Sequence, residues 1–309
     1  MPFNNLISRA DADALIPQET ADEVIQVAAQ ESVALSLCRR AVMSSKTKQM
    51  PVLSALPVAY WVAGDTGLKQ TSEAAWAGVE LVAEELATII PVPEAVIDDA
   101  DFDVWAELRG PIAEAVALKI DQAVFAGVEK PASWPQAIIP AAQAAGNVET
   151  IDAPAEQGGI YGDVEAAIGL VEADGFDPNA IAARSDFKRL VRQARSAGGD
   201  LLGEGSTSSV WDLPISYVLP GVFADPVRAV VGDFNLAVVG VRQDLTYKLL
   251  DQAVITDDTG AIIYNLPQQD MVALRVTMRV AYATGIPVTR AGSGATVYPF
   301  ATLQSPVGP

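Results

Sequence analysis

One apolar stripe, between Pro91 and Gly127, dominates the pattern of this chain. Hydrophobic side chains recur there at steps of three or four residues, the period of one face of an α-helix. They are Phe102, Trp105, Leu108, Ile112, Val116, Ile120 and Val124. A glycine is the commonest residue just past a helix end, so Gly127 marks the stop. The sequence predicts a long helix whose side chains serve packing.

The start of this helix is predicted from charge. A short extended run, Pro91–Ile97, leads into four aspartates, Asp98, Asp99, Asp101 and Asp103. Carboxylates stabilise a helix N-terminus, whereas a calcium loop needs a glycine and a glutamate that are missing at the required spacing. We therefore interpret the cluster as a helix cap. Gly110-Pro111 inside the stripe predicts a kink, or two helices meeting end to end.

The absence of histidine limits the chemistry available to the chain. None of the 309 residues is a histidine, which excludes Ser-His-Asp and Cys-His catalysis and the usual zinc sites. Only an enzyme that uses carboxylate, lysine or tyrosine chemistry stays open. The one cysteine, Cys38, excludes an internal disulfide and is interpreted as a small buried hydrophobe. We expect no catalytic residues, no metal and no cofactor.

The net charge of the chain excludes a protein that binds DNA tightly. The formal charge is −19, and no stripe of lysine and arginine could neutralise phosphates. Tight, specific binding of DNA is therefore not expected. Half of the residues are hydrophobic, which is ample for a core. No apolar run reaches the length of about 20 residues that a membrane helix needs.

Before the long helix, the pattern predicts an arm, an extended segment and a hairpin. A short helix is expected at 17–29 within the arm, and 33–56 reads as extended. Residues 57–92 read as a hairpin that turns at 64–67 and carries two tryptophans in a polar, small-residue context. Such aromatics either contact another subunit or pack within their own domain. The candidate contact residues are Tyr60, Trp61, Lys69 and Trp76.

The middle of the chain predicts a separate α/β lobe. Residues 130–155 read as a Pro/Ala-rich connection, and two helices are expected at 161–172 and 185–197. A strand at 179–184 separates them, and Ser185 with Asp186 are candidate caps of the second helix.

The end of the chain is predicted to be β. Residues 228–231 and 235–241 flank a turn, and 245–255 continues extended. Asp257-Asp258-Thr259-Gly260 is a turn signal. Residues 271–284 alternate with period two, so the apolar side chains fall on one face and Arg275, Thr277 and Arg279 on the other.

Taken in order, these segments resemble the major capsid proteins of tailed bacteriophages, whose fold is shared with encapsulin shells. The resemblance covers nearly the whole chain. It rests mainly on IPVPEAVIDDADFDVWAELRGPIAEAVALKIDQAVFAG at 90–127 and on NLPQQDMVALRVTMRVAYATGIPV at 265–288. The first is similar to the end of the family's hairpin and its spine helix, and the second to its closing strand.

The resemblance implies an α+β fold with an N-terminal arm at 1–33 and an extended loop, a hairpin, at 57–92. It implies a peripheral domain, with the spine helix and a β-sheet, made from 34–56, 93–132 and 228–309. An α/β axial domain would take 133–227. Packing of the spine helix would rest on Phe102, Trp105, Leu108, Ile112, Val116 and Ile120.

The implied function is a structural subunit that assembles as pentamers and hexamers into the icosahedral shell of a phage head in the host cytoplasm. Its partners would be other copies of itself, a separate scaffolding protein, a portal and a decoration protein, with DNA enclosed but not tightly bound. Lys69 and Asn265 are the residues nearest to a family cross-link, and we expect none to form. The alternatives are an encapsulin-like compartment and, more distantly, a cytosolic enzyme.

Overall fold

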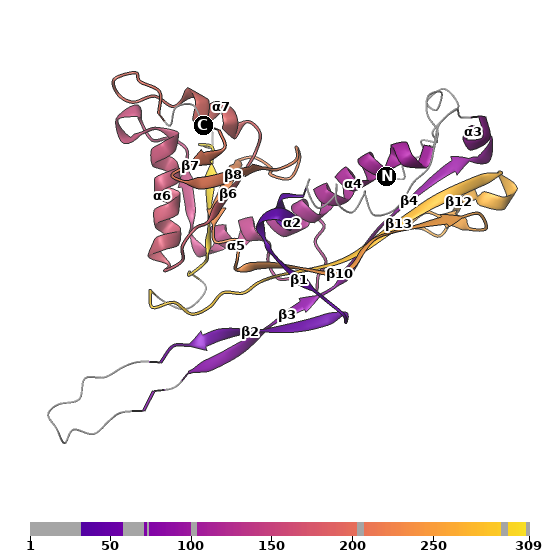
Figure 1. Ribbon diagram of the computed structural model, residues 1–309, viewed down its shortest axis with the longest axis horizontal. Coiled ribbons are helices and arrows are strands. Elements are labelled where there is room, and N and C mark those ends of the chain that lie inside the picture. Colours follow the sequence, from indigo (N-terminus) through magenta and orange to yellow (C-terminus); the bar gives the residue numbers. More distant parts are fainter. Residues whose placement is uncertain are drawn as a thin grey trace.

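The computed structural model describes residues 32–57, 71–72, 74–99, 104–202, 207–291 and 296–306. The chain forms two lobes, with a hairpin projecting well beyond both (Figure 1). One lobe holds a long helix, α4, laid along a sheet of long strands. The other holds a second sheet with α6 and α7 (Figure 1). The predicted helix at 17–29 lies outside the described residues.

The bounds of the elements are as follows. The helices are α2 (Val33–Leu37), α3 (Glu94–Asp99), α4 (Val104–Asp121), the π-turn η1 (Gln122–Ala126), α5 (Ile138–Ala145), η2 (Ala155–Gln157), α6 (Ile160–Ala173), α7 (Phe187–Gln193) and η4 (Leu266–Gln268). The strands up to residue 217 are β1 (Arg39–Val42), β2 (Thr47–Ala55), β3 (Ala75–Val82), β4 (Glu84–Pro93), β5 (Val148–Thr150), β6 (Ala180–Ala183), β7 (Ser209–Val210) and β8 (Leu213–Tyr217). The later strands are β9 (Val227–Gly232), β10 (Ala237–Leu250), β11 (Val254–Thr256), β12 (Ile262–Asn265), β13 (Met271–Thr284) and β14 (Phe300–Gln304).

The first lobe is built on a four-stranded sheet of order β1-β10-β13-β4. The predicted strand at 271–284 is confirmed at both ends as β13. Its apolar face packs in the main core with α4 through Leu274, Val276, Met278, Val280 and Tyr282. The opposite face is open in the middle but buried at both ends, beside β12 and η4 at one end and beside β3 at the other. Two different neighbours therefore make this long strand stable.

The spine helix forms much as its stripe predicts. Helix α4 runs unbroken from Val104 to Asp121 and includes Pro111, so the prediction of two helices meeting end to end is wrong. A π-turn, η1, follows, and Gly127 ends it with a left-handed φ of 73°. A glycine tolerates this φ because it has no Cβ. Gly127 therefore ends the helical segment at the predicted position.

Half of the acidic cluster lies in a separate short helix that precedes α4. Residues 91–93 end strand β4, and the chain then turns into a separate short helix, α3. Asp98 and Asp99 therefore belong to α3. Asp101 and Asp103 lie outside the described residues, so for them the helix cap stays a prediction. Proline at 93 favours this break because it cannot donate to the next rung of the strand ladder.

The hairpin is also shifted relative to the prediction. Strand β2 pairs with β3 from Thr47↔Val82 to Ala55↔Ala75, whereas β4 pairs with β13. The paired arms therefore span 47–82 and not 57–92. Met43, Leu81 and Ala83 pack with Ala281 and Ala283 of β13 and anchor the base of the hairpin.

The second lobe has a six-stranded sheet of order β5-β14-β9-β6-β8-β7. Alternate residues of β6 face two cores: Ile181 and Ala183 pack with α6 and α7, and Ala180 and Ala182 face the main core that contains α5. Strands β9 and β14 belong to this sheet, although the sequence grouped 228–309 with the first lobe. Helices α6 and α7 and strand β6 confirm the predicted α/β pattern.

Two further local predictions are wrong. Residues 33–37 form helix α2 instead of an extended segment, and the connection at 130–155 contains α5 and β5. Alanine has the highest helix propensity, so an Ala-rich connection folds into a helix when one side of it can be buried. In α5, Ile138, Ile139 and Ala142 supply that buried side.

Candidate assembly surfaces

The described arms of the projecting hairpin are mostly exposed. Strands β2 and β3 form a sheet of two strands only, and most of their side chains are exposed or half-buried. Trp76 lies on β3 opposite Leu53, with 69% of its surface exposed. Isolated two-stranded ribbons are marginally stable in water, so a second surface is expected to cover this one. Tyr60, Trp61 and Lys69 lie outside the described residues.

The spine-helix residues are placed as follows. Ile112, Val116 and Ile120 are buried in the main core, with Trp105 and Leu108 partly buried against it. Phe102 lies outside the described residues. This face packs on the sheet, so it supports the subunit from within and is not itself an exposed surface.

The acidic turn at 257–260 forms as the sequence predicts. Asp257 forms the predicted turn, because its Oδ1 accepts hydrogen bonds from the backbone N–H groups of Thr259 and Ala261. The hydrogen bond from the Thr259 hydroxyl, followed by those from the backbone N–H groups, lowers the pKa of Asp257. Among the described residues, no group of three or more carboxylate or thiol ligands could hold a metal ion.

The sequence did not predict one contact, a set of hydrogen bonds between Asp121 of the spine helix and the start of α2. Asp121 is fully buried. Its Oδ1 accepts hydrogen bonds from the Ser32 hydroxyl at 2.7 Å and the Ala34 N–H at 2.9 Å, and its Oδ2 accepts from the Val33 N–H at 3.0 Å. The carboxylate thus caps the N-terminus of a helix about 90 residues earlier in the chain. A charged residue directly after Ile120 and one turn before Val124, on the apolar stripe, was the available signal.

The buried carboxyl group of Asp121 predicts a pH dependence of the unfolding free energy. Burial raises the pKa of Asp121 to about 6, although the hydrogen bonds from Ser32, Ala34 and Val33 lower it. The folded chain then holds this proton more tightly than the unfolded chain. The resulting stability is present below about pH 4 and is lost as the pH rises through about 6, by roughly 3 kcal/mol.

The comparison that checks this prediction is the unfolding free energy of wild type against Asp121→Asn, which removes the titration, at pH 4 and pH 7. Wild type should lose more stability than the variant over this range. Equal pH slopes for the two proteins would contradict the assignment.

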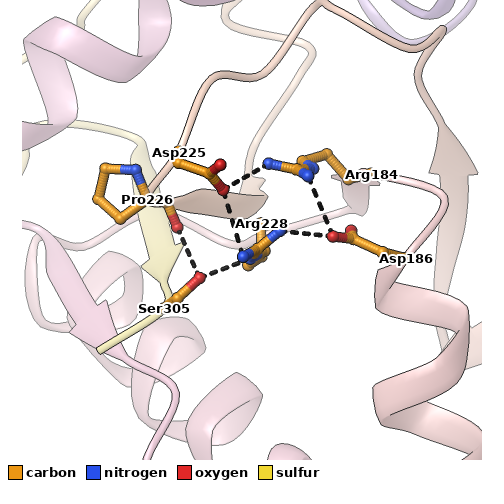
Figure 2. Close-up of polar contacts among 6 residues, drawn as sticks. All are labelled: Arg184, Asp186, Asp225, Pro226, Arg228 and Ser305. Carbon is orange, nitrogen blue, oxygen red and sulfur yellow. Dashed lines mark hydrogen bonds and ion pairs between the residues drawn. The ribbon is translucent and has the colours of Figure 1, made fainter. Parts of the chain in front are cut away.

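A second polar cluster joins three segments of the α/β lobe (Figure 2). Asp225 accepts from Arg184 at 2.8 Å and pairs with Arg228 at 3.2 Å, while Asp186 pairs with both arginines. Arg228 also donates to the Ser305 hydroxyl. The cluster therefore links the segment after β6, the start of β9 and the segment that follows β14. Asp186 occupies the cap position of α7, but its side chain makes no cap hydrogen bond, so the capping predicted for Asp186 is wrong.

Cys38 is a small buried residue, as the sequence predicts. The thiol is buried and free. Burial, with the nearby Asp121 carboxylate, raises its pKa well above the usual range, which leaves it a packing residue. No helix in the part of the chain that the structure describes is long and apolar enough to cross a membrane.

Comparison with known proteins identifies this architecture. Residues 12–285 match the Phage capsid family. The major capsid protein of Staphylococcus phage 80alpha is 26% identical over 282 residues, which cover 90% of this chain and 84% of that protein.

Solved structures agree. A chain from Microbacterium phage Oxtober96 is 36% identical, with a TM-score of 0.80, over 97% of this chain and 99% of that one. A chain from Mycobacterium phage Cain is 35% identical, with a TM-score of 0.80, over 98% and 99%. A chain of the capsid of the native GTA particle, 17% identical with a TM-score of 0.63 over 94% and 93%, shares the fold. The encapsulin alternative is not favoured. The chain therefore belongs to the phage capsid family, as a major capsid protein of the tailed-phage type.

Proposed function

We propose that this subunit builds its shell by laying the hairpin 47–82 on a neighbouring copy. The family is structural and is not an enzyme family, and shell assembly implies self-association. The observation that carries the proposal is Trp76, which is 69% exposed on a two-stranded ribbon that projects beyond both lobes (Figure 1). An exposed tryptophan on a projecting ribbon gains stability only by contact with another surface.

The proposed division of labour follows the two sheets. The β1-β10-β13-β4 sheet with α4 would form the peripheral domain, and the six-stranded sheet with α5, α6 and α7 the axial domain around five-fold and six-fold positions. Residues 1–33 would form the N-terminal arm. Since β9 and β14 pair in the axial sheet, we assign 227–232 and 300–304 to the axial domain.

We further propose a separate scaffolding protein, a portal and a decoration protein as partners. The shell would enclose DNA without gripping it, because a net charge of −19 per subunit repels phosphates at long range. Catalysis has no part in this proposal.

The test is to express the chain, with and without its neighbouring gene product, and to examine it by electron microscopy and light scattering. Closed particles or rings of five and six subunits are expected. A compact monomer under all conditions would contradict the proposal.

Replacing the hairpin tryptophan should separate folding from assembly. Trp76→Ala removes an exposed side chain, so the stability of the single subunit should change by less than about 0.5 kcal/mol. Contact between subunits should lose about 3 kcal/mol per copy at most, the burial value of the exposed ring area. Particle yield and particle melting temperature measure this loss.

Val42→Ala serves as the control, because Val42 is 84% exposed on the edge strand β1, outside the hairpin. It should assemble normally. Particles of Trp76→Ala that form and melt as wild type does would mean that the hairpin contact is not made by this residue.

A further inference from the structure

The outer face of α6 carries a broad acidic groove with an aromatic end. The groove has a volume of about 960 Å³. Gly162, Ala166 and Gly169 lie on one side of α6 and leave the helix surface low. Six carboxylate residues and one indole ring line the groove, together with apolar residues such as Pro154, Ile168 and Leu213. The charged and aromatic lining residues are Glu149, Asp152, Asp163, Glu165, Glu172, Asp177 and Trp211. Trp211 is 54% exposed.

The described residues offer these carboxylates no ion-pair partner. None of the ion pairs among the described residues includes Glu149, Asp152, Glu165 or Glu172. Burial first, and then the nearby Asp163 and Asp152, raise the pKa of Glu149. Like charges that crowd together without a counter-ion favour a cationic partner.

The matching cations lie on another side of the same lobe. Helix α7 exposes Arg189 and Arg192, one turn apart. No ion pair among the described residues includes either arginine. Arg195 borders a smaller hollow with Asp152 of its own subunit, so Arg189 and Arg192 are better placed to reach a neighbour. Helix α7 therefore offers two exposed arginines that are available to carboxylates of a neighbouring subunit.

We propose that the α6 groove of one subunit receives α7 of the next subunit around the five-fold and six-fold axes. The inference rests on the proposed function, since it requires self-assembly. The groove and α7 are different surfaces of one lobe, with α6 along its outer edge and α7 at its top (Figure 1). A head-to-tail contact of this kind is the type from which a closed ring of subunits can be built.

Arginine suits the groove for two physical reasons. Its planar guanidinium can hold a carboxylate with two parallel hydrogen bonds, and it stacks on aromatic faces. Glu165 and Glu172 would supply the carboxylates and the exposed indole of Trp211 the face. A row of charges that alternates from subunit to subunit also gives orientation, because a reversed subunit would meet like charge.

The test is a charge exchange in the full chain. The groove variant carries Glu165→Arg and Glu172→Arg, and the helix variant carries Arg189→Glu and Arg192→Glu. Both residue types are good helix formers and all four positions are exposed, so the subunit should fold. Each variant alone places like charges across the contact, and particle yield should fall at least about tenfold. The quadruple variant restores opposite charges and should recover yield to near wild type.

The control variant Glu107→Arg with Glu114→Arg, on exposed positions of α4, changes the net charge as much as the groove variant does and should assemble. Normal assembly of either double variant, or failure of the quadruple variant to recover, would overturn the contact. Circular dichroism of each unassembled chain checks that folding is retained. Loss of wild-type particles would instead refute the proposed function, so the two failures are distinguishable.

Discussion

Leu274→Asp should abolish folding of the subunit. Leu274 lies on the face of β13 that packs in the main core, and 5% of its surface is exposed. It pairs with Leu249 of β10 on one side and with Ile90 of β4 on the other. A carboxylate there loses its hydration without a partner. The cost exceeds about 4 kcal/mol, which is most of the stability of an ordinary domain. We expect aggregated or unfolded chain, as measured by circular dichroism and solubility.

Arg275→Asp is the matched control, since it makes the same new residue one position along the strand on the opposite, exposed face. It should fold and should unfold at a denaturant concentration close to that of wild type. If both variants fold equally well, the burial assigned to the two faces of β13 is wrong.

Asp121→Ala should lower the unfolding free energy by about 3 kcal/mol at about pH 5, and should release α2 from the spine helix. The substitution leaves the N–H groups of Val33 and Ala34 and the Ser32 hydroxyl without their acceptor. A buried donor that loses its partner costs about 1–3 kcal/mol. Chemical unfolding measures the total, and hydrogen exchange at residues 33–37 measures the local release.

Glu114→Ala, on the exposed side of the same helix, is the control and should change stability by less than about 0.5 kcal/mol. Unchanged hydrogen exchange at 33–37 in Asp121→Ala would show that α2 is held by its apolar contacts alone.

Local periodicity predicted the elements that pack one apolar face against the same core along their length. Helix α4 and strand β13 belong to this class, because Ile112, Val116 and Ile120 on the helix meet Val276 and its neighbours on the strand. Each repeats its apolar positions over many residues, and a one-residue error would turn those side chains out of the core. The family resemblance rested on these same two segments, and the match over 12–285 confirms it.

The sequence predicted which residues form strands better than it predicted which strands pair with one another. Residues 84–92 were assigned to the hairpin because they follow Trp76 and Gly78 in sequence. Instead, β4 separates from β3 at Ala83 and pairs with β13 about 190 residues later. Similarly, β14 returns to pair with β9 and β5 in the other lobe. Neither choice leaves a local signal, because strands of either sheet carry the same alternation.

The polar contacts follow the same division. The sequence by itself determined that the chain has a long packing helix, a long β-strand at 271–284, no histidine chemistry and a strong negative charge. Only the tertiary structure decided that Asp121 caps a helix about 90 residues away, that Arg184, Asp186, Asp225 and Arg228 join, and that the α6 groove lacks counter-ions. Periodic burial is written in neighbouring residues, whereas a charge pair depends on two segments that the chain brings together only on folding.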